Sequence, residues 1–155
     1  NRQLHALRST IGKPKVDVLK DRIADINPEC VVHVEQSFVT ADNADQLLGS
    51  RDVGVEDAAG SMRSCDAVVD CIDAHRDKAA IIATCRKYGI PVVVVGGTAG
   101  KVDPMCIKTA DLTDVSYDRM LMRVRKELRQ KYDFPKVMSQ RDKIIPFGVP
   151  CVYSE

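Results

Sequence analysis

The 155-residue sequence contains no tryptophan, few other aromatic residues and no long apolar run. Its longest uninterrupted apolar stretch, Pro91–Val95, is far shorter than the ~20 residues that a membrane-spanning helix needs. An excess of one charge is also lacking, because 23 Lys and Arg are balanced by 22 Asp and Glu, for a net charge of +1. Any nucleic-acid contact therefore has to come from a local basic patch. We expect a soluble protein with one domain of ordinary size.

The six cysteines form no C-x-x-C pair and no close cluster with histidine. This spacing argues against a structural zinc site. Several cysteines lie in apolar segments, where a free thiol behaves as a small buried hydrophobe. We expect a reduced, cytoplasmic protein, with mitochondrial association as the alternative in a eukaryotic source.

Apolar periodicity and turn residues divide the chain into alternating helices and strands. The helical spacing predicts helices over Asn1–Ser9, Pro14–Ile26, Asp42–Leu48, Arg76–Tyr88 and Ser116–Tyr132. The β-branched and apolar runs predict strands over Cys30–Val34, Ala67–Ile72, Pro91–Val95, Met105–Thr109 and Gly148–Tyr153. Gly49–Ser64 is interpreted as an exposed loop with room for one helical turn. The alternation predicts an α/β fold of Rossmann type, a mostly parallel sheet flanked by helices.

The segment Asp66–Lys78 is the part around which this fold is organised. Ala67–Val69 is an apolar run typical of a central strand of a parallel sheet, buried on both faces. Asp70 and Asp73 follow at its end, where open α/β sheets bind their ligands. The more frequent explanation of such an aspartate is that Asp73 caps the next helix. Spacing alone leaves both interpretations of Asp73 open.

Gly96-Gly97-Thr98-Ala99-Gly100 resembles a phosphate loop only superficially. A dinucleotide loop has the spacing G-x-G-x-x-G and opens a helix. Here Val102-Asp103-Pro104 follows, and no helix is predicted. We interpret the segment as a tight turn into the next strand.

The helix over Ser116–Tyr132 has a basic face, formed by Arg119, Arg123, Lys126 and Arg129 opposite an apolar stripe. A basic helix face is usually only solvated, and no aromatic residues are interleaved to stack on bases. Contact with nucleic acid is the alternative.

A set of short motifs carries a family resemblance over nearly the whole chain. They are Asn1-Arg2-Gln3, His5-Ala6-Leu7-Arg8, Gly12-x-x-Lys15, Ile26-Asn27-Pro28-Glu29-Cys30, Val69-Asp70-Cys71-Ile72-Asp73, Lys78-Ala79-Ala80, Gly96-Gly97-x-x-Gly100, Asp103-Pro104, Asp111-Leu112 and Cys151-Val152-Tyr153-Ser154-Glu155. In combination they resemble the ThiF/MoeB superfamily of adenylating domains, which is related to ubiquitin-activating enzymes. Within it the sequence most resembles the tRNA threonylcarbamoyladenosine dehydratases.

The resemblance implies an ATP site. In the superfamily the Arg of Asn-Arg-Gln and the Lys of Gly-x-x-Lys contact the phosphates, and the second Asp of Asp-x-x-Asp holds magnesium. On this chain those residues are Arg2, Lys15 and Asp73, with Asn1 as a further polar contact. Fixed cations and a carboxylate-bound magnesium would neutralise the charge that develops as pyrophosphate leaves.

The implied reaction is the activation of a carboxylate by ATP to an acyl adenylate, as in ATP-dependent ligases. In the dehydratase branch the threonylcarbamoyl carboxylate of a tRNA adenosine is activated, and internal attack closes a ring and expels AMP. Gln3 and Asp70 are assigned to structural support, because the motifs give them no direct ligand role. The resemblance also implies a homodimer and a sulfur-transfer or cysteine-desulfurase partner.

Three other functions remain open at this point. Within the superfamily, the chain could adenylate the C-terminal carboxylate of a ubiquitin-like or sulfur-carrier protein. From other classes, it could be an NAD-binding module or an inactive scaffold that dimerises.

The sequence also departs from the family pattern. It lacks the paired C-x-x-C zinc motifs of ThiF and MoeB, which favours the dehydratase branch, and its Gly49–Ser64 loop is long. It also lacks the family's opening strand and G-x-G-x-x-G loop. We therefore expect residues 1–155 to be a partial adenylating domain, truncated at the amino terminus, that binds ATP weakly by itself and is inactive.

Overall fold

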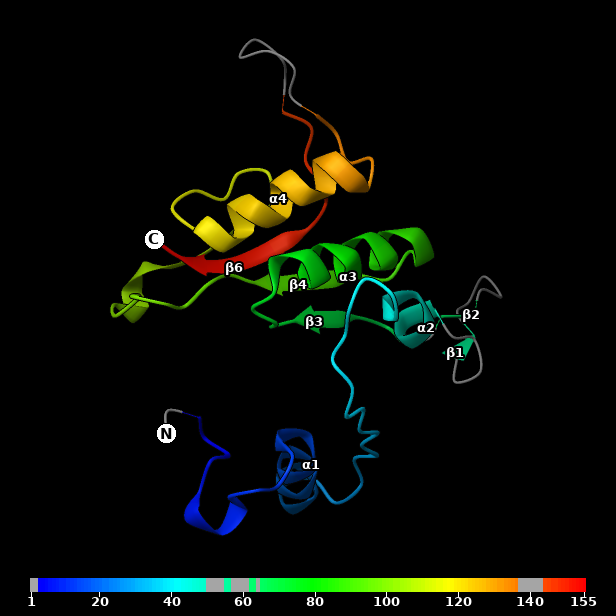
Figure 1. Ribbon diagram of the computed structural model, residues 1–155, viewed down its shortest axis with the longest axis vertical. Helices are drawn as coiled ribbons and strands as arrows, with labels where there is room; N and C mark the ends of the chain where they lie inside the picture. Colours follow the sequence, from blue (N-terminus) through cyan, green and yellow to red (C-terminus); the bar gives the residue numbers. More distant parts are fainter. Residues whose placement is uncertain (1–2, 50–54, 57–61, 64, 137–143) are drawn as a thin grey trace. The chain divides into compact units, whose positions relative to one another are not determined.

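The computed structural model describes residues 3–49, 55–56, 62–63, 65–136 and 144–155 (Figure 1). Where composition predicts one domain, the chain divides into two compact units, unit 1 (Asn1–Phe38) and unit 2 (Val39–Glu155). Within the described ranges, no helix combines the length and the apolar character needed to cross a membrane.

Unit 1 is built around helix α1 (Lys15–Ile26), which confirms the predicted amphipathic helix. Pro14 is its N-cap residue, and the backbone N–H of Asn27 closes its last turn by donating to Ile23 O. The helix predicted over the first nine residues is wrong for the described part. Residues 3–7 form a turn and an irregular segment, and only a short 3-10 helix follows, Arg8–Thr10.

The strand predicted over Cys30–Val34 is also wrong. The segment has no ladder partner within the described residues, and the side chain of Val31 is 79% exposed. β-Branched residues favour an extended backbone, but a strand also needs a neighbour that accepts and donates its backbone hydrogen bonds. No described residue of unit 1 is fully buried, so the apolar residues of α1 make no core within the unit.

Unit 2 contains a four-stranded sheet. Its strands are β3 (Val68–Asp70), β4 (Val92–Val95), β5 (Ile107–Asp111) and β6 (Pro150–Ser154), in the order β3-β4-β6-β5. β3, β4 and β6 are parallel, whereas β5 runs antiparallel to β6. The mostly parallel sheet confirms the predicted fold class.

A second, small sheet lies in the segment predicted as a loop. β1 (Val55–Glu56) and β2 (Met62–Arg63) pair antiparallel, so the predicted helical turn is not found in the described part. The rest of that loop lies outside the described residues.

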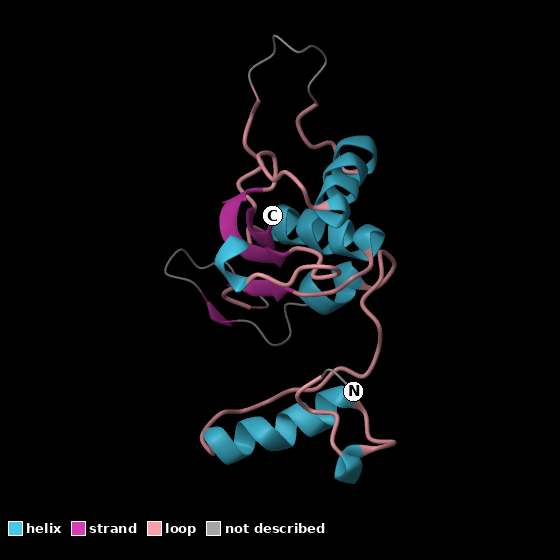
Figure 2. Ribbon diagram, turned by 90° about the vertical axis from the view of Figure 1, so that its left-hand side faces the viewer, coloured by secondary structure: helices cyan, strands magenta, loops and turns pink. Residues whose placement is uncertain are grey.

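Three helices accompany the large sheet, α2 (Ala44–Gly49), α3 (His75–Tyr88) and α4 (Arg119–Lys131). All three were predicted, with small differences at their ends. α3 and α4 cover one face of the sheet, and their apolar residues form the core with the strands (Figures 1 and 2). Gly89 ends α3 in the left-handed conformation at φ 65°, which a glycine adopts without steric cost.

The sheet is buried on one face only within the described structure. Val92 and Val94 of β4 are buried under the helices, whereas Val93 between them is 37% exposed and Val69 of β3 is 68% exposed. The prediction of a central strand buried on both faces is therefore wrong for β3, which ends the order of described strands. A run of apolar residues cannot distinguish a strand covered on one face from one covered on both.

Hydrogen bonds to the Asp111 side chain connect the end of β5 with the segment before β6. Its carboxylate accepts hydrogen bonds from the backbone N–H groups of Thr113, Phe147 and Val149, and from the Thr113 hydroxyl. Although burial by itself raises the pKa of Asp111, these hydrogen bonds outweigh it and hold the pKa below the usual aspartate value. The carboxylate therefore stabilises the fold above the pKa of an unfolded aspartate, and this contribution is lost as the pH falls through the lowered folded value.

Candidate functional site

The turn between β3 and α3 forms an acidic site at the carboxyl end of a parallel strand. Asp70 is the last residue of β3 and is 2% exposed. Its Oδ1 accepts hydrogen bonds from the backbone N–H of Ile72 at 3.1 Å and from Lys78 Nζ at 2.9 Å. Lys78 is completely buried and also donates to the backbone carbonyl of Asp70. This confirms the structural role assigned to Asp70 and gives it a partner that sequence reasoning missed.

Lys78 was not predicted as a buried residue because lysine is almost never fully buried without a partner. The signal was present in the sequence. Asp70 lies at a strand end, and Lys78, the fourth residue of the next helix, is followed by the core residues Ala79 and Ile82. A lysine among core positions of α3 indicates a buried counter-ion nearby.

Asp73 lies three residues beyond β3 and is exposed. The prediction that it caps α3 is wrong, since the N-cap residue is Ala74 and no side chain caps this helix end. Within the described residues no hydrogen bond or ion pair involves the Asp73 carboxylate. This carboxylate is therefore available to bind a ligand or a ligand's metal ion.

A single carboxylate suits one kind of metal ion. Magnesium usually binds to proteins through one or two carboxylates, together with water and substrate phosphates. The described residues contain no cluster of three or more His, Cys, Asp or Glu side chains that could hold a metal by themselves. Asp73 therefore fits a magnesium ion that arrives with a phosphate ligand and does not fit a resident metal centre.

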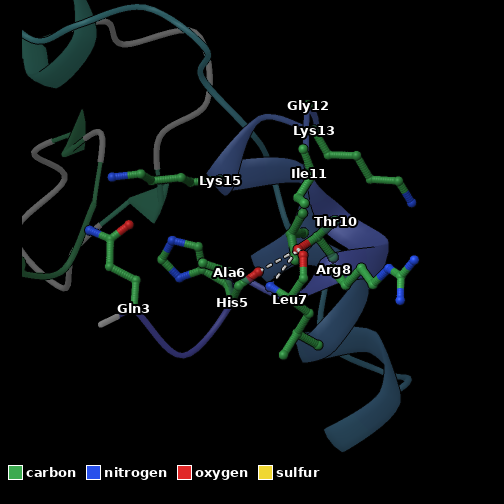
Figure 3. A pocket seen from close by; sticks show the side chains of 11 residues that line it. Gln3, His5, Ala6, Leu7, Arg8, Thr10, Ile11, Gly12, Lys13 and Lys15 are labelled. Atoms are coloured by element: carbon green, nitrogen blue, oxygen red, sulfur yellow. Dashed lines mark hydrogen bonds between the residues drawn. The ribbon is translucent and has the colours of Figure 1, made fainter. Parts of the chain in front are cut away.

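Unit 1 contains a cavity of about 440 Å³ beside the start of α1 (Figure 3). Among the described residues, the lining includes the cations Arg8, Lys13 and Lys15, together with His5, and no carboxylate. Lys15 is the first residue of α1, whose N-terminal N–H groups lack a capping side chain. Lysine and an uncapped helix N-terminus both favour an anion.

The lining side chains lie on two sides of the cavity. Figure 3 shows Gln3, His5 and Lys15 extending to one side, while Arg8 and Lys13 extend to the other. The structure thus places the sequence-predicted Lys15 with Gln3 and His5. The predicted site residues Asn1 and Arg2 lie outside the described residues.

Thr10 holds the turn that carries His5. Its hydroxyl donates to the His5 carbonyl oxygen at 2.8 Å and also lies 3.0 Å from the Leu7 carbonyl oxygen. The Thr10 hydroxyl oxygen also accepts a hydrogen bond from the Leu7 backbone N–H at 2.9 Å. These bonds close the chain between His5 and Thr10 into a compact turn. The sequence analysis gave neither residue a role in a site, although it named His5 in a family motif.

Gly96 and Gly97, which follow β4, let the backbone pack closely against Asp118. A Cβ at Gly96 would collide with the Asp118 carboxylate, and Gly97 N–H donates to the same carboxylate at 2.8 Å. Asp118 also caps α4 by accepting from the Leu121 N–H. No helix opens after these glycines, since the chain continues to a 3-10 turn at Pro104–Cys106 and then to β5. The interpretation as a turn into a strand is confirmed, although β5 begins two residues later than predicted.

The basic face of α4 is smaller than predicted. Arg119, Arg123 and Lys126 are exposed. Arg129 is half-buried, where its Nε donates to the Pro135 carbonyl oxygen at 3.0 Å and its guanidinium lies over the Phe147 ring. Arg129 therefore packs against the segments that follow α4 and is not part of an exposed basic face.

Two of the cysteines are excluded as nucleophiles. Burial raises the pKa of the Cys85 thiol to about 12 and does the same for Cys151. Both side chains are 0% exposed and lie in the core of unit 2. A nucleophilic cysteine needs exposure and a lowered pKa, so these two are structural.

Comparison with known proteins gives a consistent result. The ThiF family model matches residues 1–140. The tRNA threonylcarbamoyladenosine dehydratase of Escherichia coli K12 is 41% identical over 154 residues, which cover 99% of this chain and 51% of that protein. The protein of the same name from Haemophilus influenzae is 35% identical, covering 99% of this chain and 52% of its own length.

Solved structures agree with the sequence matches. The crystal structure of E. coli tRNA N6-threonylcarbamoyladenosine dehydratase, TcdA, in complex with ATP superimposes with a TM-score of 0.81 at 38% identity. The match covers 99% of this chain and 56% of that one. A complex of the same protein with AMP gives a TM-score of 0.80. The chain spans about half the length of the curated relatives it matches.

Proposed function

This chain belongs to the ThiF family, and on that premise we propose that it takes part in the ATP-dependent dehydration of threonylcarbamoyladenosine in tRNA. The observation that carries the proposal is the 41% identity, over 99% of the chain, to a dehydratase of that name. The binding of ATP by a 38% identical structure supports ATP as the activating nucleotide.

We assign the ATP site to two groups of residues. Lys15, with Arg2 and Asn1 from the same motif region, would contact the phosphates. The cavity around Lys15 supports this, because its lining holds cations and no carboxylate. Asp73 would hold magnesium, which supplies positive charge to the triphosphate when bound. The exposed Asp73 carboxylate, which no side chain of the described structure engages, supports this role.

The proposed reaction has two steps. In the first, the threonylcarbamoyl carboxylate attacks the α-phosphorus of ATP, the α–β phosphoanhydride bond breaks, and pyrophosphate leaves. In the second, an oxygen of the same threonylcarbamoyl group attacks the activated carbonyl, a ring closes, and AMP leaves. The second step needs no protein nucleophile, since the attacking oxygen is tethered at high effective molarity. The buried thiols of Cys85 and Cys151 agree with this.

The substrate can be tested directly with the protein that carries this chain. We expect AMP and pyrophosphate to form when ATP is supplied with tRNA containing threonylcarbamoyladenosine, and the modified nucleoside to lose the mass of one water. Mass spectrometry of the digested tRNA measures this, with unmodified tRNA as the control. Adenylation of a small carrier protein in place of the nucleoside would contradict the proposal.

The exposed basic residues of α4 are proposed to contact the tRNA backbone. We expect the double variant Arg123→Glu/Lys126→Glu to weaken tRNA binding and to lower the slope of log affinity against log salt by up to about two, because each lost phosphate contact removes about 0.9. Binding measured over a salt series tests this. The matched control is Lys20→Glu/Arg22→Glu, which makes the same charge change on exposed residues of α1. Equal salt slopes in both variants would contradict a specific role for α4.

A further inference from the structure

His5 has an unusual environment for a histidine in a solvent-facing cavity. Its Nε2 is buried and has no hydrogen-bond partner within the described structure. A buried polar atom without a partner carries a desolvation cost of the kind that native structures usually avoid. His5 lines the cavity, and a turn of its imidazole toward a bound ligand would give Nε2 the missing partner.

The surroundings of His5 indicate the charge of that ligand. The Lys15 side chain extends in the same direction as that of His5, whereas the cations Arg8 and Lys13 extend the other way (Figure 3), and the described lining residues include no carboxylate. An imidazole with a proton on Nε2 donates a hydrogen bond, and a phosphoryl oxygen is a strong acceptor. The start of α1 has no capping side chain, and the one carboxylate in its first turn, Asp17, accepts hydrogen bonds from Gln36 Nε2.

Local hydrogen bonds hold the backbone at His5. The Thr10 hydroxyl donates to the carbonyl oxygen of His5 itself, and the 3-10 turn Arg8–Thr10 leads the chain round to Lys15. His5 and Lys15 are therefore brought to one cavity by a short turn within unit 1.

We propose that His5 is a phosphate-binding residue that donates from Nε2 to the β- or γ-phosphate of ATP, beside Lys15. The proposal rests on the proposed function, since it assumes that the cavity of unit 1 receives ATP. It predicts that His5 distinguishes ATP from AMP, because AMP lacks the two outer phosphates.

The test measures ATP and AMP binding by calorimetry in the protein that carries this chain. We expect His5→Met, which keeps the volume but removes the donor, to weaken ATP binding about 10- to 100-fold and to leave AMP binding unchanged. His5→Gln, which places an N–H donor near the position of Nε2, should retain ATP affinity to within about threefold. His33→Phe is the control, because His33 is an exposed histidine in the extended segment of the same unit.

The outcomes separate this proposal from the proposed function. If the unchanged protein binds ATP and His5→Met binds it equally well, the role of His5 is wrong and the function stands. Equal losses of ATP and AMP affinity in His5→Met would also overturn the role of His5. If the unchanged protein binds neither nucleotide, both proposals fail. Should His5→Met lose its folded circular dichroism spectrum, His5→Gln decides, because failure of that folded variant to bind ATP overturns the role of the donor.

Discussion

Replacing Asp73 with alanine is expected to reduce ATP–pyrophosphate exchange by at least about 100-fold and to leave the fold intact. Loss of one preorganised electrostatic contact to a reacting phosphoryl group typically costs 10²- to 10³-fold in rate. The fold should survive because the Asp73 side chain is exposed and neither caps α3 nor bonds to another described residue. Exchange of labelled pyrophosphate into ATP measures the effect, and circular dichroism checks the fold.

The control for this experiment is Asp66→Ala. Asp66 is also exposed and lies before β3, whereas Asp73 lies after it, so the two variants make the same charge change at opposite ends of one strand. We expect Asp66→Ala to exchange at the unchanged rate. If Asp73→Ala exchanges pyrophosphate at the wild-type rate, the carboxylate plays no part in ATP activation. The proposed magnesium site would then be wrong.

Replacing Lys78 with methionine is expected to lower the free energy of unfolding by about 3–5 kcal/mol, the usual cost of leaving a buried charge without its partner. Asp70 and Lys78 are an ion pair with a nitrogen to oxygen distance of 2.9 Å, and both side chains are 0% exposed. Methionine fills most of the space of the lysine stem, so the loss comes mainly from the carboxylate left without a counter-ion. Urea unfolding measures the difference.

Two further variants identify the cause of that loss. Asp70→Asn in the Lys78→Met background removes the stranded charge and should recover part of the stability. Lys87→Met breaks an ion pair with Asp45 whose side chains are both more than half exposed, and it should cost much less. If Lys78→Met is no more destabilising than Lys87→Met, the buried pair does not stabilise the acidic turn as inferred.

The reliable sequence predictions were those that depend on local periodicity. The apolar spacing of α1, α3 and α4 predicted three helices whose ends match to within a few residues. The glycine after α3 also placed the end of that helix correctly, and the motif around Asp70 and Asp73 placed the strand-to-helix turn before it. A helix satisfies its own backbone hydrogen bonds, so it can be predicted from local sequence without knowledge of a distant partner.

The predictions that failed depended on contacts between distant segments. Cys30–Val34 has strand composition, but no described strand pairs with it. Val69 looked like a residue buried on both sides, although the helices cover only the other face of the sheet. Arg129 looked like part of a solvated face until the chain after α4 returned over it. Apolar periodicity shows none of these, because it records which residues are apolar and not which segment covers them.

The sequence by itself determined the α/β class, the order along the chain of the helices of unit 2 and the strands of its large sheet, and the family to which the motifs belong. Only the tertiary structure decided which charged groups are bound and which are free. It paired Asp70 with Lys78, left the carboxylate of Asp73 exposed, closed Gly97 onto Asp118, and left Nε2 of His5 without a partner. The physical reason is that local propensity acts through neighbouring residues, whereas burial and hydrogen-bond pairing depend on segments that meet only after folding.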